Sequence, residues 1–344
     1  MRSPRFSPLT TPLSRRSMLA AGGALGVGAL LTACGDGGSS DSAKTGSDSG
    51  PWKFKDDRGK TAKADKTPKK IVAFTGAAAA LHDFGIECTG VFGPTQLKNG
   101  KADPQAGGID VDKVTILGNA WGEFNIEKYA ALGPELLITN MLQPNVLWYV
   151  PEESKGKILG LAPSVGVNGA KTSLPHPIQR YAELAESLGA DLKAKKVTEA
   201  KARFEKAAAT LRSAAKASGG LKVMCASGSA DLLYVSDPAV YTDLMYFREL
   251  GVEFIKPDKV DGGFFEHLSW ENADKYPADL ILLDNRTAAL QPKDLAKKPT
   301  WAKLPAVKAG QVTPWLSEPR FSYTGCAPLL ERLAAAIEKS KKVG

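Results

Sequence analysis

Few residues of this chain are placed for catalysis or for holding a bare metal ion. The histidines His82, His176 and His267 are scattered, and none has a second metal-ligating residue at suitable spacing. Ser227 and Ser229 lie in CASGSAD, which lacks the GxSxG pattern of an activated serine, and no histidine is placed by sequence to serve either. The sequence therefore favours a protein that is not an enzyme, and it makes a bare-metal site a weak interpretation.

Two glutamates occupy matching positions in a repeat. Glu127 in IEKYAALGPELLIT and Glu271 in WENADKYPADLILL are 144 residues apart, and each segment leads into an apolar run. Each glutamate is expected in the first turn of a short helix, with Asn125 or Ser269 as the N-cap. Since a helix start favours an acidic residue, local rules explain each copy, and the repeat indicates one helix-strand unit in each half of the chain.

Short runs rich in Val, Ile and Leu are the candidate strands that position Glu127, Glu271 and the other polar residues named above. We predict buried parallel strands over residues 70–76, 134–140, 221–228 and 278–285, because each run is bounded by turn residues. Helical patterns such as AAAALHDFG and YTDLMYFRELG separate the runs, and each ends at a glycine. This alternation of strands and helices predicts an α/β fold.

The middle of the chain differs from both halves. Residues 177–218 are rich in Ala, Lys, Glu and Leu and contain no strand candidate. A division at Gly189 leaves a second helix of up to about 28 residues, or about 42 Å. We therefore expect an N-terminal α/β lobe over residues 52–175, connecting helices over 176–219 and a C-terminal α/β lobe over 220–344.

The start of the chain does not belong to this fold. Arg15 and Arg16 precede an apolar stretch of 16 residues, which is shorter than the roughly 20 that a membrane-spanning helix needs. Residues 1–33 are expected to be a signal peptide of the twin-arginine type, with general secretory export as the alternative. The segment LTAC resembles a lipobox, in which Cys34 would carry the lipid. The polar tract over residues 34–51 predicts a flexible tether.

Charge and cysteine content narrow the function further. The formal net charge of +8 falls to +4 when residues 1–33, with four arginines and no acids, are removed. No Lys/Arg block with interleaved aromatic residues remains, so nucleic acid is not an expected partner. Cys88, Cys225 and Cys326 are an odd number with no CxxC spacing, and Cys225 is expected in a buried strand.

Together these features resemble the solute-binding lipoproteins of bacterial ABC importers for ferric siderophores, heme and cobalamin. The resemblance covers nearly all of residues 52–344. It rests on the order and spacing of the lipobox, the tether, GEFNIEKYAALGPELLIT, the long helix, LSWENADKYPADLILL and WAKLPAVKAGQVTPW. It implies a periplasmic-binding-protein-like fold of the helical-backbone type, in which two α/β lobes enclose a ligand cleft and are bridged by a long helix. It also implies a monomer anchored to the outer face of the cell membrane by Cys34.

The resemblance also assigns roles to residues. In that family a surface glutamate of each lobe docks onto arginines of the membrane permease, and by position these are Glu127 and Glu271. A siderophore fills the coordination sphere of its iron with its own oxygens, so iron enters only as the siderophore complex and no cofactor is expected. The cleft then needs aromatic faces, a few hydrogen-bond donors and an arginine aimed at the iron-bound oxygens.

Candidate cleft residues lie on loops beyond the carboxyl ends of the predicted strands, where α/β lobes bind ligands. Trp121 stands where hydroxamate-binding relatives often carry an arginine, which leaves the identity of the siderophore open. For each aromatic residue taken singly, core packing is an equal alternative, and each arginine could be a solvated surface residue. The candidates are Trp121, Gln143, Trp148, Tyr149, Tyr234, Tyr241, Phe264, Phe265, Arg286, Trp315, Arg320, Phe321 and Tyr323.

The expected function is capture of a ferric siderophore, of hydroxamate type such as a ferrioxamine, and its delivery to an ABC permease for iron uptake. Heme or cobalamin on the same fold is the main alternative. Heme needs an axial ligand, which Tyr149, Tyr234 or Tyr241 could supply. A cell-surface receptor or adhesin without an import role is a further alternative.

Overall fold

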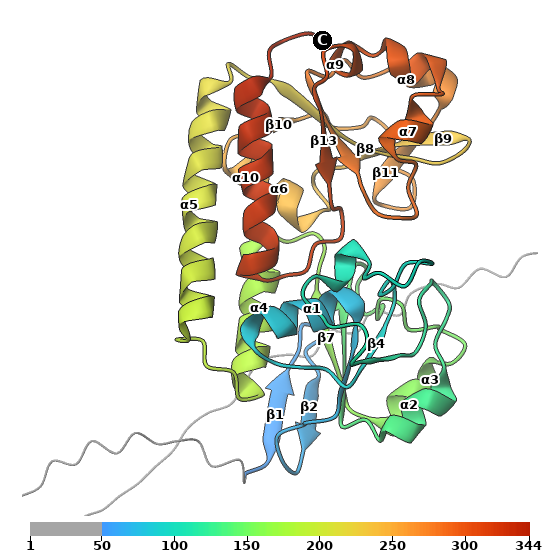
Figure 1. Cartoon of the computed structure of the whole chain (residues 1–344), viewed down its shortest axis with the longest axis vertical. Coiled ribbons are helices and arrows are strands. Elements are labelled where there is room, and N and C mark those ends of the chain that lie inside the picture. The colour runs from blue at the N-terminus through green and yellow to red at the C-terminus, as the bar shows by residue number, and fades with distance from the viewer. Residues whose placement is uncertain (1–49) are drawn as a thin grey trace, which may run out of the picture. The chain divides into compact units, whose positions relative to one another are not determined.

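A five-stranded parallel sheet forms the centre of the N-terminal lobe, which lies in the lower half of Figure 1. The computed structural model describes residues 50–344. The sheet order is β5-β4-β3-β6-β7, from β3 (Ile71–Phe74), β4 (Gly90–Phe92), β5 (Thr115–Ile116), β6 (Leu136–Met141) and β7 (Ser164–Asn168). The other elements are the hairpin β1 (Trp52–Lys55) and β2 (Thr61–Ala64), and the helices α1 (Thr75–Phe84), η1 (Pro104–Ala106), α2 (Ile126–Leu132), α3 (Lys155–Leu161) and α4 (Pro175–Ser187).

The C-terminal lobe is built on a mixed sheet. Its strands follow the order β11-β9-β8-β12-β13, and β10 pairs with β8. The strands are β8 (Lys222–Gly228), β9 (Leu232–Ser236), β10 (Glu253–Phe254), β11 (Phe265–Ser269), β12 (Leu280–Asp284) and β13 (Val312–Trp315). The helices are α6 (Thr242–Glu249), η2 (Trp270–Asn272), α7 (Pro292–Leu295), α8 (Pro299–Lys303), α9 (Pro305–Lys308) and α10 (Tyr323–Lys339).

The four predicted strands are confirmed as β3, β6, β8 and β12. All six residues of β6 and all five of β12 are buried, as expected of strands covered on both faces. Cys225 lies buried in β8, as predicted. The C-terminal sheet is not wholly parallel, because β9 follows β8 through a tight connection and runs antiparallel to it, and β11 is antiparallel to β9.

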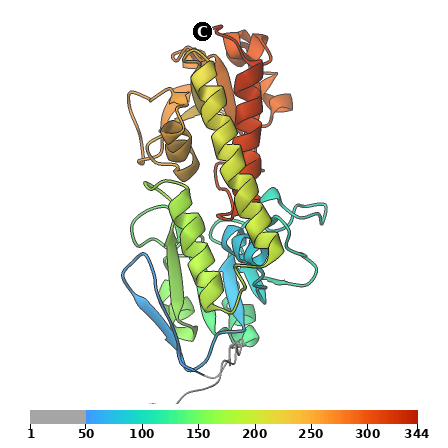
Figure 2. The ribbon, with the colours of Figure 1, turned by 90° about the vertical axis from the view of Figure 1, so that its left-hand side faces the viewer.

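The long helix predicted after Gly189 is α5, Lys195–Ala217, with 23 residues. It runs beside both lobes with α10 packed along its upper part (Figure 2). Arg203 of α5 binds both carboxylate oxygens of Glu331 of α10, at 2.7 and 2.6 Å. The preceding helix, α4, packs on the N-terminal lobe, where the Tyr181 hydroxyl lies 2.5 Å from the Asn140 side-chain oxygen. The connection between the lobes is therefore α5, stiffened by α10.

The two copies of the repeat differ in structure. Asn125 caps α2 as predicted, because its side chain accepts a hydrogen bond from the backbone N–H of Lys128 at 2.8 Å. The expected helix in the second copy is wrong: η2 is a single 3-10 turn, and Ser269 makes no capping hydrogen bond. The indole of Trp270 instead donates to the carbonyl oxygen of Ser229 at 3.2 Å, which ties the turn back to the β8–β9 connection.

Several predictions lie outside the described residues. These are the signal peptide over 1–33, the lipidated Cys34 and the tether up to residue 49. Among the helices of residues 50–344, none is long and apolar enough to cross a membrane.

Candidate functional site

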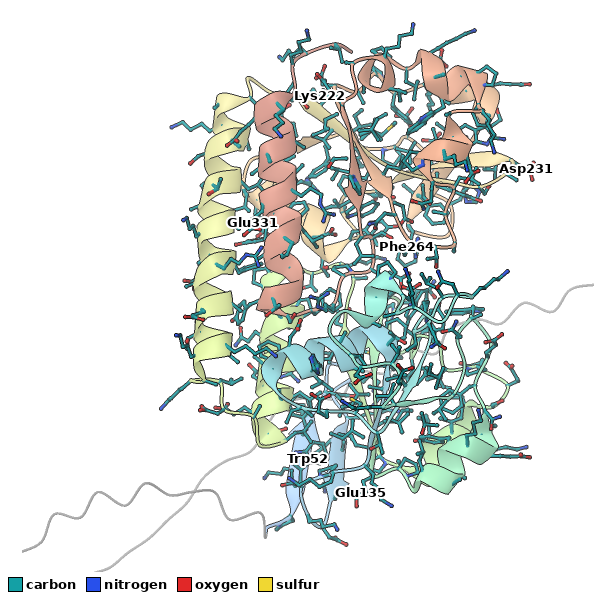
Figure 3. All side chains as sticks on the ribbon, in the orientation of Figure 1. Trp52, Glu135, Lys222, Asp231, Phe264 and Glu331 are labelled. Atoms are coloured by element: carbon teal, nitrogen blue, oxygen red, sulfur yellow. The ribbon has the colours of Figure 1, made fainter. Side chains whose placement is uncertain are left out.

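A cavity of about 440 Å³ lies between the lobes, among the segments that follow β5, β6, β7, β9, β12 and β13 and the start of β11. Phe264 marks it in Figure 3, at the edge of the C-terminal lobe that faces the N-terminal lobe. The N-terminal lobe lines it with Trp121, Asn140, Leu142, Gln143, Val146, Trp148, Gly169 and Ala170. The C-terminal part lines it with Val240, Tyr241, Thr242, Phe264, Phe265, Arg286, Ser317, Glu318, Pro319 and Phe321.

Eight of the thirteen candidate residues are brought together in this lining. They are Trp121, Gln143, Trp148, Tyr241, Phe264, Phe265, Arg286 and Phe321. They come from six separate segments in two lobes, so the tertiary structure gathers what the sequence disperses. Their contact with a ligand stays a prediction.

The other five candidates are outside the lining. Tyr149 lies against Trp121 and Trp148, and Tyr234 lies against Phe265 and His267. Trp315 is 3% exposed and packs against Tyr241, while Tyr323 packs between Phe84 and Phe204. Arg320 donates to Asp83 of α1 at 2.8 Å. The structure therefore gives these side chains packing and lobe-joining contacts rather than a place on the cavity wall.

Two tryptophan rings of the N-terminal lobe line the cavity, and both pack against Tyr149. Trp121 is 62% exposed, and its ring centroid lies 4.8 Å from that of Trp148 and 5.0 Å from that of Tyr149. Burial, with a smaller contribution from the charge of Glu318, raises the pKa of Tyr149 to about 12, so its hydroxyl stays neutral. A large exposed indole at the mouth of a cavity is suited to covering the apolar part of a bound molecule.

Arg286 is the only cation among the lining residues. Its guanidinium binds Asp284, with Nη2 at 2.7 Å from Oδ2, and it also binds Glu318 through Nη1. Burial alone would lower the pKa of Arg286, but the charges of Glu318 and Asp284 raise it, so the side chain stays protonated. One arginine held between two carboxylates leaves this cluster with a net charge of −1.

Glu318 is a site residue that sequence reasoning missed. Besides Arg286, its carboxylate accepts hydrogen bonds from Trp148 Nε1 at 3.2 Å and Gln105 Nε2 at 3.1 Å, both in the N-terminal lobe. Its position in PWLSEPRFSYTG, among predicted residues, was the available signal. The sequence does not reveal that this acid reaches across the cavity to join the two lobes.

The floor of the cavity is held by backbone hydrogen bonds between the lobes. Lys171 N–H donates to the Val240 carbonyl at 2.8 Å, and Leu174 N–H donates to the Thr242 carbonyl at 3.0 Å. Gly169 allows the close approach, because a Cβ there would lie 3.0 Å from the Phe321 ring. These bonds and the Arg320–Asp83 ion pair favour small movements of the lobes on ligand binding.

A buried carboxyl behind the cavity makes stability depend on pH. Asp243 is fully buried and accepts a hydrogen bond from Trp315 Nε1 at 2.6 Å, and its second oxygen has no partner. Burial raises the pKa of Asp243 to about 7. A carboxyl whose pKa rises on folding stabilises the protein below its unfolded pKa, and this stabilisation is lost as the pH rises to about 7.

We expect Asp243→Asn to remove this dependence and to raise the free energy of unfolding at pH 8 by up to about 4 kcal/mol. Urea unfolding of the variant and of the parent at pH 5 and pH 8 measures the effect. Asp231→Asn, at an exposed position of the same lobe, is the matched control and should leave the pH dependence unchanged. Parallel pH profiles for Asp243→Asn and the parent would contradict the prediction.

The two repeat glutamates lie on the surface. Glu127 is exposed in the first turn of α2, and Glu271 is exposed in η2. Within residues 50–344 neither carboxylate has an ion-pair partner. The same region contains no group of three or more His, Cys, Asp or Glu side chains that could hold a metal ion.

Two α/β lobes with an aromatic cavity between them and a long helix along one side define a solute-binding protein of the helical-backbone type. The chain belongs to the periplasmic binding protein family, whose model matches residues 75–319. Members of this family act outside the cytoplasm and are binding proteins. No curated protein sequence matches this chain.

Solved structures agree with this assignment. DesE, a ferric-siderophore receptor protein from Streptomyces coelicolor, is 58% identical, and the match covers 85% of this chain and 100% of DesE with a TM-score of 0.83. The petrobactin-binding protein YclQ from Bacillus subtilis is 18% identical, with 84% and 99% covered and a TM-score of 0.63. SirA from Staphylococcus aureus, solved with staphyloferrin B, is 20% identical, with 84% and 99% covered and a TM-score of 0.60. The last two support the fold alone.

Proposed function

We propose that this protein captures a ferric siderophore in the cavity between its lobes and delivers it to an ABC permease for iron uptake. The observation that carries the proposal is the aromatic cavity with its single arginine, in a chain 58% identical to a ferric-siderophore receptor. This role requires no bond-making chemistry, so we propose a binding protein rather than an enzyme. Iron is part of the ligand, and the protein needs no cofactor of its own.

The charge of the cavity favours a hydroxamate siderophore. Hydroxamate groups carry one negative charge each and together neutralise Fe³⁺, whereas catecholate groups carry two and leave an anionic complex. Asp284 and Glu318 outweigh Arg286, so a neutral complex, or a cationic one such as a ferrioxamine with a free amine, is accepted at lower electrostatic cost. Arg286 can turn its donors from Glu318 toward the iron-bound oxygens of the ligand.

Heme is less well suited to the same cavity. Tyr241 is the only tyrosine among its lining residues, and burial raises the pKa of this phenol. A tyrosine that ligates ferric heme does so as the phenolate, which burial disfavours. The arrangement of residues 50–344 therefore favours a siderophore over heme.

Delivery rests on the exposed glutamates. We infer that Glu127 of one lobe and Glu271 of the other dock onto permease arginines, and that Cys34 anchors the mature protein to the outer face of the cell membrane. Exposed ion pairs add little stability, but they fix orientation and raise the association rate. The protein can then act as a monomer that meets its permease by diffusion along the membrane.

A fluorescence titration tests the ligand. Trp121 and Trp148 line the cavity, so a ferric ferrioxamine is expected to quench tryptophan emission with saturation at one ligand per protein. Iron-free ferrioxamine, a ferric catecholate, heme and cobalamin are the comparison ligands. Saturable quenching by heme or cobalamin, with none by any ferric siderophore, would overturn the proposal.

A further inference from the structure

Positive charge is concentrated in the hairpin of β1 and β2 and the segment that follows it. Residues 52–70, which we call the basic hairpin, hold seven lysines and one arginine against three aspartates, a net charge of +5. The whole chain carries +8 and residues 1–49 carry +2, so residues 71–344 together carry only +1. The basic hairpin therefore holds nearly all the net charge of the described protein.

The lysines of the basic hairpin point to solvent. Lys53, Lys55, Lys60 and Lys63 are exposed, and none of these four has an ion-pair partner within residues 50–344. Glu135 pairs with Lys66 at 3.8 Å and also interacts with Lys70. Lys53 and Lys63 are directly paired across the two strands. Like charges at such a pair destabilise a hairpin, so these two lysines do not contribute to the stability of the fold.

The other face of the hairpin is fixed to the lobe. Trp52 and Phe54 are buried, the Trp52 indole donates to Ser187 of α4 at 3.2 Å, and the Arg180 guanidinium lies 4.8 Å from the Phe54 ring centroid. Arg180 also donates to the Lys55 carbonyl at 2.6 Å. Because the aromatic rings face inward, they cannot stack on nucleic-acid bases, and the outward face carries the ammonium groups of the lysines.

The hairpin lies next to the start of the described chain and at the end of the N-terminal lobe remote from the cavity. Figure 1 shows β1 and β2 there, and Figure 3 shows Trp52 and Glu135 at the same end. Seventeen residues lie between Cys34 and Trp52. A flexible chain of this length spans about 25 Å on average and about 60 Å at most.

We propose that the basic hairpin is a membrane-docking surface that binds anionic phospholipid headgroups and holds the N-terminal lobe against the bilayer. The proposal rests on the lipid anchor of the proposed function, since the tether keeps the hairpin near the membrane. The binding is electrostatic, because Trp121 and Leu161 are the only large exposed apolar side chains of the described residues and neither lies in the hairpin. Such binding weakens as salt shortens the Debye length.

The test uses the mature chain from residue 34 with Cys34→Ser, which has no lipid and retains every described residue. Sedimentation with vesicles of equal parts phosphatidylglycerol and phosphatidylcholine, and with pure phosphatidylcholine, measures binding. We expect binding to the anionic vesicles alone. Each lysine near an anionic bilayer strengthens binding about fivefold, so Lys53→Gln/Lys55→Gln/Lys63→Gln should weaken it about a hundredfold.

The matched control removes three exposed lysines of α5 and the loop just before it, outside the basic hairpin. Lys193→Gln/Lys201→Gln/Lys216→Gln changes the net charge equally and should keep most of the vesicle binding. The hairpin variant should fold normally, since it relieves the Lys53–Lys63 repulsion, and should bind the siderophore with unchanged affinity. If the parent protein does not bind a ferric siderophore, the proposed ligand is wrong, but the vesicle experiment still tests the docking surface.

Several outcomes would overturn the docking surface. The proposal is wrong if the parent protein does not bind anionic vesicles. It is also wrong if the control variant loses as much vesicle binding as the hairpin variant, or if the hairpin variant binds vesicles as well as the parent does. Displacement by inorganic phosphate, beyond that by chloride at equal ionic strength, would point to a site for free phosphate instead. Binding to soluble poly(glycerol phosphate) but not to vesicles would point to an anionic polymer.

Discussion

A protein in which glutamine replaces both Glu127 and Glu271 is expected to bind its siderophore with unchanged affinity and to lose nearly all uptake. Both carboxylates are exposed, unpaired within residues 50–344 and outside the cavity lining, so the change cannot disturb the ligand site directly. Loss of both charges removes one docking contact from each lobe. Uptake of radiolabelled ferric siderophore by cells that lack the native protein measures the effect, and the fluorescence titration measures affinity.

The matched control for the docking glutamates changes two other exposed acids. Glu186 lies at the end of α4 and Glu338 lies near the end of α10, and neither has an ion-pair partner within residues 50–344. Glu186→Gln/Glu338→Gln should leave both uptake and affinity unchanged. Normal uptake by the Glu127/Glu271 variant would refute the docking role, and a fall in its affinity would show that these residues act on the ligand site.

Replacement of Arg286 is expected to have the largest effect on ligand affinity. Arg286→Met removes the charged donors that face the cavity, and charged hydrogen bonds contribute about 1.5–3 kcal/mol each. We therefore expect the dissociation constant of the ferric siderophore to rise about a hundredfold. Fluorescence titration measures the change.

A second variant protects this test from a folding failure. The Asp284 side chain is 1% exposed, so Arg286→Met leaves a buried carboxylate without its partner and lowers stability by about 3–5 kcal/mol. Arg286→Lys keeps the positive charge but loses the planar guanidinium group with its paired N–H donors. This variant should fold normally and bind the ferric siderophore about tenfold more weakly. Unchanged siderophore affinity in Arg286→Lys would contradict a role for the Arg286 guanidinium in ligand binding.

Arg320 is the informative comparison, because the sequence alone ranks the two arginines equally. Arg320 binds Asp83 outside the cavity, so Arg320→Met should lower thermal stability and change affinity by less than about threefold. An equal loss of affinity in Arg320→Met and Arg286→Met would mean that the ligand occupies a different part of the cleft.

The fold was predictable wherever local signals agreed. The strands β3, β6, β8 and β12 are continuous apolar runs, and α5 is a long run of helix formers that begins after Gly189. The second repeat copy was not predictable, because η2 is held by the Trp270 indole on the β8–β9 connection and not by a cap. The antiparallel strands β9 and β11 were likewise missed, since strand direction depends on tertiary pairing.

The candidate site was also predictable only in part. Strand-end position led to the segments that line the cavity, because the carboxyl ends of parallel strands open onto one edge of each lobe. It could not separate Phe264 from Trp315 or Arg286 from Arg320, since all four lie at strand ends or in the segments next to them. Packing against neighbours distant in the chain removed Trp315 and Arg320 from the cavity wall.

The amino-acid sequence by itself determined the two α/β halves and the helix between them, because these follow from local periodicity and turn chemistry. It also contains the lysines of the basic hairpin, although not the direction in which they point. Only the tertiary structure decided that Glu318 crosses the cavity to Trp148 and Gln105, and that Arg286 lies between two carboxylates. The Glu318 contacts join residues at least 32 positions apart in the chain, so no local pattern records them.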